Sequence, residues 1–188
     1  MSSFYLFFTF LIMQRLVELV VAKRNEWWMK NRGAKEFGQE HYRIIVCLHA
    51  MFFVVFFIEV QARHAELSPV WPFFLSLFFL TQFLRVWAIA SLGKCWNTKI
   101  IILPEAPIVE KGPYRFLKHP NYLVVIMEFM IIPCMYQAYL TAIVFSVLNG
   151  FILAVRIPME EKALHEHTEY PISTGLKWRL SPKNPNKV

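Results

Sequence analysis

Residues 70–92 read VWPFFLSLFFLTQFLRVWAIASL, an apolar stretch with a single charged side chain. A helix needs about 20 mostly apolar residues to cross the hydrocarbon part of a bilayer, so this stretch predicts a membrane-spanning helix. Similar blocks run from 4 to 22 and from 44 to 60. A fourth block, 122–157, is too long for one span and is broken at 133–135, which predicts a hairpin of two helices. The sequence therefore predicts five spans.

The composition also indicates a membrane protein. Of the 188 residues, 56% are hydrophobic and 18% are charged, whereas a soluble domain averages about 45–50% apolar and about 25% charged residues. Eighteen phenylalanines, eight methionines and six tryptophans are too many for one small core. This composition excludes intrinsic disorder and a collagen-like repeat. Three cysteines without a CxxC spacing argue against a disulfide scaffold, and we expect them to be reduced and buried.

The lysine and arginine residues test the number of spans. They gather after the first span, after the third span and in the tail, while the loop between spans two and three holds only Arg63. Positively charged loops stay in the cytoplasm. The three basic segments share one side only if the chain crosses five times, with the N-terminus outside and the C-terminus inside. The first block lacks a basic start and a cleavage site, so we do not expect a signal peptide.

The formal net charge of +7 does not require a nucleic-acid partner. The basic residues lie beside membrane spans, where anionic lipid attracts them, and no RNA-binding motif interleaves them. We therefore expect membrane lipid, and no nucleic acid, as a partner.

Several charged residues lie inside the predicted spans, where charges are unfavourable and often functional. Arg15 and Glu18 are three residues apart, so they share a helix face and can pair. Arg85 is expected to snorkel or to pair with Glu128, which is either a packing partner or a site residue. Glu59, near the outer end of its span, is expected to reach the interface.

A metal site and a nucleophilic triad are not supported. His165 and His167 lie beside glutamates, but residues two apart on a helix point to different faces, so a shared ion is not expected. The chain has no GxSxG motif and no aspartate.

Two polar segments fall on the same predicted side of the membrane. In the first, KGPYRFLKHPNY (111–122), a Gly-Pro turn precedes Pro120, which suits the first turn of a helix. His119 and Asn121 then flank a helix N-terminus, and its free N–H groups suit an anionic group. In the second, RIPMEE (156–161), two glutamates and an arginine can hold both signs of charge. Each segment alone is also compatible with an ordinary interfacial turn.

Together, GPYRFLKHPNY and, after a two-helix hairpin, RIPMEEKAL resemble the isoprenylcysteine carboxyl methyltransferase family. The resemblance covers about residues 92–164. MKNRGAKEFG and WNTKIIILPEA look closest to the short bacterial branch, in which alkylpyrones are acceptors. The resemblance implies a protein of the bacterial plasma membrane whose active site is open to the cytoplasm.

The resemblance implies a binding site for S-adenosylmethionine that is not a Rossmann fold, and the chain indeed lacks GxGxxG. Its cofactor contacts would fall on Tyr114, His119, Pro120, Asn121, Tyr122, Glu160 and the backbone of Ala106, Pro107, Ile108 and Val109. Arg156 matches the arginine that faces the acceptor, so Arg156 and Glu160 are the implied catalytic residues. A further polar contact would fall near Lys99. Lys118 stands where the family commonly has arginine, and Val124 where it has glycine.

The expected fold is an all-α integral membrane protein with about five transmembrane helices, the last two a helical hairpin. We expect one membrane domain over 1–188, with three spans in 1–92 and the catalytic part in 93–188. By the resemblance, it would be an S-adenosylmethionine-dependent O-methyltransferase for an oxyanion on a lipophilic small molecule or lipidated acceptor, either an alkylpyrone enol or a prenylcysteine-type carboxylate. Two alternatives are an NADPH-dependent membrane sterol reductase, a class that is generally longer, and a non-catalytic lipid-binding protein.

Overall fold

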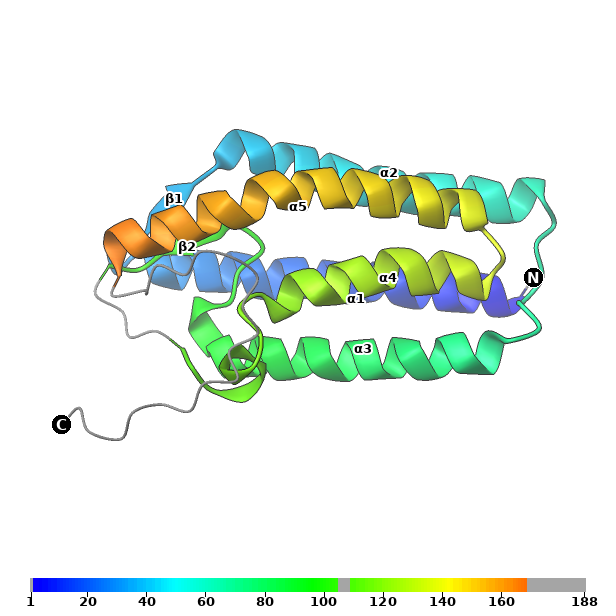
Figure 1. The fold of residues 1–188 in the computed structure, drawn as a ribbon, viewed down its shortest axis with the longest axis horizontal. Coiled ribbons are helices and arrows are strands. Elements are labelled where there is room, and N and C mark those ends of the chain that lie inside the picture. Colours follow the sequence, from blue (N-terminus) through cyan, green and yellow to red (C-terminus); the bar gives the residue numbers. More distant parts are fainter. Residues whose placement is uncertain (1, 105–108, 169–188) are drawn as a thin grey trace.

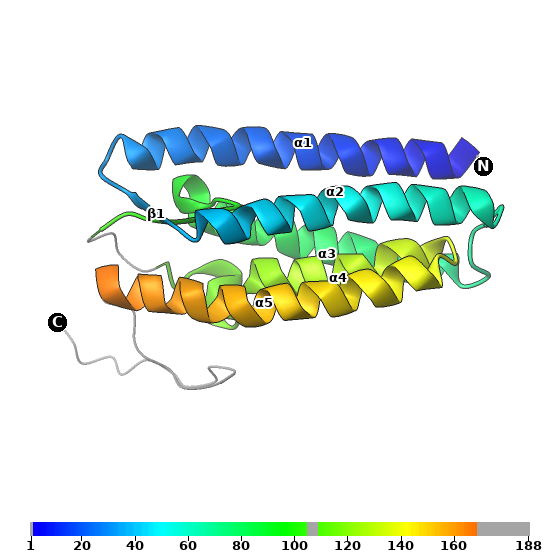
Figure 2. The same ribbon diagram turned by 90° about the horizontal axis from the view of Figure 1, so that it is seen from above.

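The computed structural model describes residues 2–104 and 109–168. Within these residues, five α-helices lie side by side in one bundle (Figures 1 and 2). They are α1 (Ser2–Lys30), α2 (Gln39–Ala62), α3 (Trp71–Leu92), α4 (Pro120–Met135) and α5 (Tyr139–His167). All except α4 are long and apolar enough to cross a membrane. The predicted all-α membrane fold is confirmed, while α4, at 16 residues, is shorter than a typical span.

The two ends of the bundle differ in structure. At one end, which we call the hairpin end, lie the α2–α3 and α4–α5 turns and the N-terminus (Figure 1). At the opposite end, the sheet end, β1 (Lys35–Phe37) pairs antiparallel with β2 (Ile100–Ile102). The connections after α1 and α3 and the end of α5 all lie at the sheet end, so the described basic segments share one side, as the charge distribution predicted.

The helical hairpin departs from its predicted boundaries. α4 continues through Pro133 to Met135, and α5 runs past Pro158 to His167 instead of stopping near residue 157. The segment 156–161 is therefore part of a continuous helix. Residues four apart lie on the same helix face, so the continuous helix places Arg156 and Glu160 on one face of α5.

Aromatic rings close the hairpin end of the bundle. Phe4 of α1 contacts Tyr136 with ring centroids 5.2 Å apart, and Phe52 of α2 contacts Phe129 of α4 at 4.6 Å and Phe145 of α5 at 5.5 Å. Lipid tails are as apolar as these side chains, so the hydrophobic effect does not drive helices together inside a membrane. Close packing of this kind holds them together instead.

A network of buried charges joins α1, α3 and α4. Arg15 pairs with Glu18 at 2.8 Å and with Glu128 at 2.5 Å, while Arg85 pairs with Glu18 at 2.5 Å and also with Glu128. Gln82 donates to Glu128 at 2.7 Å. The predicted pairs Arg15–Glu18 and Arg85–Glu128 are confirmed, and Arg85 does not snorkel. Two arginines and two glutamates make the network neutral overall.

Two expectations about exposure are wrong. Glu59 does not reach the interface, because it is only 7% exposed and caps the first turn of α5. Its carboxylate accepts hydrogen bonds from the backbone N–H groups of Leu140 at 3.2 Å and Thr141 at 2.7 Å, and from the Thr141 hydroxyl at 2.6 Å. Of the three free cysteines, Cys47 is exposed and the other two are half-buried.

Replacing Glu59 with leucine should lower the free energy of unfolding by about 1–3 kcal/mol, because the buried donors of α5 lose their acceptor. Thermal unfolding of the detergent-solubilised protein measures the change. The matched control is Glu66→Leu, at an exposed glutamate on the same end of the bundle. Equal unfolding temperatures for the two variants would contradict the capping role.

Candidate functional site

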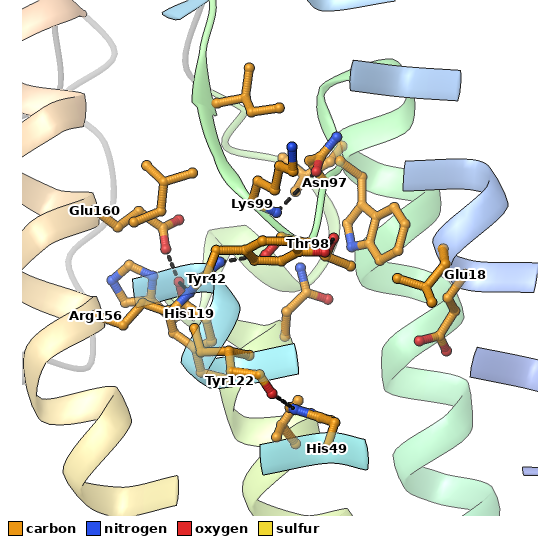
Figure 3. A pocket seen from close by; sticks show the side chains of 18 of the residues that line it. Glu18, Tyr42, His49, Asn97, Thr98, Lys99, His119, Tyr122, Arg156 and Glu160 are labelled. Carbon is orange, nitrogen blue, oxygen red and sulfur yellow. Dashed lines mark hydrogen bonds between the residues drawn. The ribbon is translucent and has the colours of Figure 1, made fainter. Parts of the chain in front are cut away.

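A cavity of about 590 Å³ begins at the sheet end and continues between the helices toward the middle of the bundle. All five helices and the segment from residue 95 to 103 contribute to its wall. Figure 3 shows part of the lining, with polar side chains from α2, α4, α5 and the segment after α3 turned toward the same space. Its volume lies within the usual range of about 300–1,000 Å³ for small-molecule sites.

The loop before α4 is fixed against α3 by a glycine. Gly112 has a φ of +61°, and a β-carbon there would collide with the Ser91 hydroxyl, so only glycine fits this turn. The short 3₁₀ helix Gly112–Arg115 follows and presents Tyr114 to the cavity. The Asn121 amide donates a hydrogen bond to the Tyr114 hydroxyl oxygen at 2.9 Å. The Tyr114 hydroxyl proton remains able to donate to a ligand.

The start of α4 places two rings beside the cavity. Pro120 is the first residue of the helix, as predicted, and it is buried. The rings of His119 and Tyr122 stack with centroids 5.2 Å apart. His119 Nε2 also lies 3.2 Å from a carboxylate oxygen of Glu161.

Arg156, Tyr122 and Glu160 form a hydrogen-bonded cluster that joins α4 to α5 (Figure 3). Arg156 Nε donates to the Tyr122 hydroxyl at 2.9 Å, and that hydroxyl donates to the Glu160 carboxylate. Arg156 Nη2 donates to the backbone oxygen of Thr98 at 2.5 Å. Arg156 is 6% exposed, and its Nη1 makes no hydrogen bond to the described residues. The cluster fixes one cation and one carboxylate on the same wall.

The protonation of Tyr114 follows from its surroundings. Burial raises the pKa of its hydroxyl, the Glu160 carboxylate raises it further, and these effects outweigh the hydrogen bond from Asn121, which lowers it. Tyr114 therefore remains a neutral phenol at physiological pH.

Lys99 lines the cavity, but its ammonium group is already paired with two carboxylates. Its Nζ lies 2.9 Å from Glu26 and 3.1 Å from Glu36. Burial lowers the pKa of Lys99, yet the hydrogen bonds with these two glutamates outweigh burial and raise the pKa. The amine is therefore a cation that ties α1 and β1 to the segment before β2.

The structure brings most of the predicted site residues to one cavity. Lining it are Val109, Tyr114, His119, Asn121, Tyr122, Arg156 and Glu160. Pro120 is not among the lining residues, and its contact with a cofactor stays a prediction. Ala106, Pro107 and Ile108 lie outside the described residues.

The two departures from the family pattern have different positions. Lys118 lines the cavity and pairs with Glu161 at 3.3 Å. Val124 is buried between helices and is not a lining residue. Among residues 2–104 and 109–168, no group of three His, Cys, Asp or Glu side chains is arranged to hold a metal ion.

Sequence reasoning missed several polar lining residues. On α2 these are Tyr42 and His49, on α5 Asn149, and after α3 Asn97 and Thr98. A signal was present in the two helices, because Tyr42 and His49, like Asn149 and Arg156, recur after about two helical turns. Polar residues repeated in this way within an apolar span mark a face turned away from lipid.

The apolar bundle and the polar cavity at its sheet end define a class, the helical integral membrane proteins with a ligand-sized site near one end of the spans. The chain belongs to the isoprenylcysteine carboxyl methyltransferase family, whose sequence model matches residues 74–166. Family membership identifies it as a membrane methyltransferase in the broad sense.

Two relatives extend the similarity across most of the chain. The uncharacterized protein YpbQ of Bacillus subtilis (strain 168) is 44% identical over 165 residues, which are 88% of this chain and 98% of that protein. An uncharacterized protein of Haemophilus influenzae is 28% identical over 151 residues, which are 80% of this chain and 88% of that protein. No solved structure matches the chain.

Proposed function

We propose that the protein is an S-adenosylmethionine-dependent O-methyltransferase that acts on an oxyanion of a lipophilic acceptor, an alkylpyrone enol or a prenylcysteine-type carboxylate. In this proposal the sheet end faces the cytosol of a bacterial cell and the spans lie in the plasma membrane. The observation that carries the proposal is the Arg156–Tyr122–Glu160 cluster. It joins the two sequence motifs on one cavity that reaches from the sheet end into the bundle.

The residues present fit the cofactor. S-adenosylmethionine would supply an electrophilic methyl group on a sulfonium. Glu160 would hold a positively charged part of it, and the ring of Tyr122 would offer a face to the sulfonium by a cation–π contact. The Tyr114 hydroxyl and the N-terminus of α4 would donate to its polar and anionic groups. Val109 would border it.

Arg156 would hold the acceptor. A guanidinium orients an oxyanion through charge-assisted hydrogen bonds, and Nη1 of Arg156 is directed to no described residue. A terminal carboxyl group ordinarily has a pKa of about 3.3–3.7 and is already ionised at neutral pH, so its methylation needs no general base. Positioning of the reacting groups then supplies most of the rate enhancement.

The inner part of the cavity supports access from the lipid. Leu16 and Leu19 of α1 and Val46 of α2 line it, and each of these residues is about half exposed. An apolar tail would pass between α1 and α2 at this level. The cofactor would reach the same cavity from the sheet end.

Calorimetric titration with S-adenosylmethionine tests the proposal. We expect binding to the purified protein and a loss of at least about tenfold in affinity for His119→Ala and Glu160→Gln, about 1.4 kcal/mol, because each removes a ligand-facing group. Glu166→Gln is the matched control, at an exposed glutamate of α5 outside the cavity.

Unchanged affinity in both cavity variants would contradict the proposed site. Tight binding of NADPH without binding of S-adenosylmethionine would favour the reductase alternative. Binding of neither would favour a non-catalytic lipid-binding protein.

A further inference from the structure

The floor of the cavity carries polar groups that methyl transfer does not require. Asn149 lines the cavity about two turns before Arg156 on α5, which is about 10 Å deeper in the bundle. His49 lies about two turns beyond Tyr42 on α2 and also lines the cavity. Arg85 of α3 lines the same cavity. Polar side chains from three helices therefore line one cavity.

Two of these side chains each have one buried nitrogen that has no hydrogen-bond partner among the described residues. Asn149 is 2% exposed and Arg85 is 6% exposed. Among the described residues, neither Asn149 Nδ2 nor Arg85 Nε has a hydrogen-bond partner. Buried donors are nearly always paired, so two orphaned donors on one cavity indicate a ligand that satisfies them.

Neighbouring groups hold Arg85 and His49 in place. Arg85 uses its Nη1 and Nη2 atoms to bind Glu18 and Glu128, which fixes the plane of the guanidinium and the direction of its Nε–H. The His49 ring is anchored by a contact of 2.9 Å between Nδ1 and the Ile45 carbonyl oxygen, and it packs on Phe129 at 5.1 Å. Contacts within the protein therefore set the positions of Arg85 and His49 before a ligand binds.

The charge at the floor selects the kind of ligand. The positive charges of Arg85 and Arg15 are matched by Glu18 and Glu128, each within a paired network. The carboxylates of Glu18 and Glu128 would repel a negatively charged group of the ligand. A neutral oxygen would accept hydrogen bonds from the unpaired N–H groups. Ketone, ester and hydroxyl oxygens meet this requirement.

We propose that the floor of the cavity is a second polar subsite, which binds a neutral oxygen on the lipophilic acceptor about 10 Å from the oxyanion held at Arg156. The inference rests on the proposed function for the position of the oxyanion. It asks for a neutral oxygen that the two acceptor types named above do not carry on their tails, so the acceptor is an amphiphile with two oxygen functions, one ionised and one neutral about 10 Å further along the chain.

The test compares two probes in equilibrium binding. About 10 Å corresponds to about eight bonds of an extended hydrocarbon chain, so the probes are hexadecanoic acid and the same acid with a ketone at its ninth carbon. Both are titrated into the purified full chain in lipid nanodiscs, without S-adenosylmethionine. We expect the keto acid to bind about five- to tenfold more tightly, the effect of one added hydrogen bond.

Asn149→Leu should remove this preference, so that the two acids bind equally. Ser146→Ala is the matched control, because the Ser146 hydroxyl is also buried and has no partner among the described residues, yet Ser146 does not line the cavity. It should keep the preference. Equal binding of the two acids by the wild-type chain would overturn the inference, as would an unchanged preference in Asn149→Leu.

The result is independent of the cofactor. A keto-acid preference in a chain that binds no S-adenosylmethionine would leave the subsite standing and remove the proposed function. Methyl transfer without a preference for the keto acid would support the proposed function and remove the subsite. The wild-type comparison needs no variant, so it decides the matter even if Asn149→Leu does not fold.

Discussion

Replacement of Glu128 by leucine should lower the free energy of unfolding by about 3–5 kcal/mol. Glu128 is 2% exposed and accepts from Arg15, Arg85 and Gln82. Without its carboxylate, two guanidinium groups in the membrane interior compete for Glu18 alone. A buried charge that loses its partner is strongly destabilising, because neither water nor lipid can replace the carboxylate. Unfolding in mixed detergent micelles measures the change.

A double variant separates the charge effect from the change in packing. Arg85→Met together with Glu128→Leu removes one charge of each sign and leaves Arg15 paired with Glu18. This double variant should be clearly more stable than Glu128→Leu alone, because buried ion pairs are often replaceable by apolar side chains. A single variant within about 1 kcal/mol of wild type would contradict the role of the network.

Arg156→Leu should lower the rate of methyl transfer by about 10²–10³-fold at saturating cofactor. The guanidinium is held by Tyr122 and Thr98, and its Nη1 makes no hydrogen bond to the described residues. Its loss removes a donor aimed at the charged oxygen, so the turnover number should fall more than the cofactor affinity. Initial rates over a range of cofactor concentrations separate the two parameters.

Two further arginine variants control this experiment. Arg156→Lys keeps the charge but cannot make the same pair of hydrogen bonds to Tyr122 and Thr98, so it should recover only part of the rate. Arg115→Leu changes an exposed arginine that is not a lining residue and should remain close to wild type. A rate in Arg156→Leu within about threefold of wild type would contradict the acceptor role, because removal of such a donor has a much larger effect.

The bundle was predictable because lipid imposes simple rules on sequence. The apolar blocks gave the helices, and the lysines and arginines gave the end at which the connections gather. The pairs Arg15–Glu18 and Arg85–Glu128 followed from the instability of lone charges in spans. The convergence of residues 111–122 and 156–161 on one cavity was also expected from the resemblance, and the geometry agrees.

The helix boundaries were harder to predict because proline is an ambiguous signal. Pro158 lacks an N–H group and its ring disfavours the preceding helical turn, which argues for an end near residue 157. In the structure α5 continues, and its last turns pack against β2, where Met159, Ala163 and Leu164 form a small apolar cluster with Ile100 and Ile102. This tertiary packing outweighs the local preference.

Some contacts have no signature in the sequence. Thr98 serves the site through its backbone oxygen, a group that every residue carries. Glu59 looked like an interfacial residue until the hairpin brought the start of α5 beside it. Asn149 is a lone amide in an apolar helix, which sequence alone does not distinguish from a packing residue.

The most direct test of the account is transfer of a labelled methyl group to lipid. Purified protein in nanodiscs is incubated with methyl-tritiated S-adenosylmethionine and a bacterial membrane lipid extract, and the organic phase is counted and analysed by mass spectrometry. We expect label in a lipid whose mass has increased by one methyl group, with Arg156→Leu close to the protein-free background. Equal organic-phase counts for the wild-type chain and Arg156→Leu would contradict it.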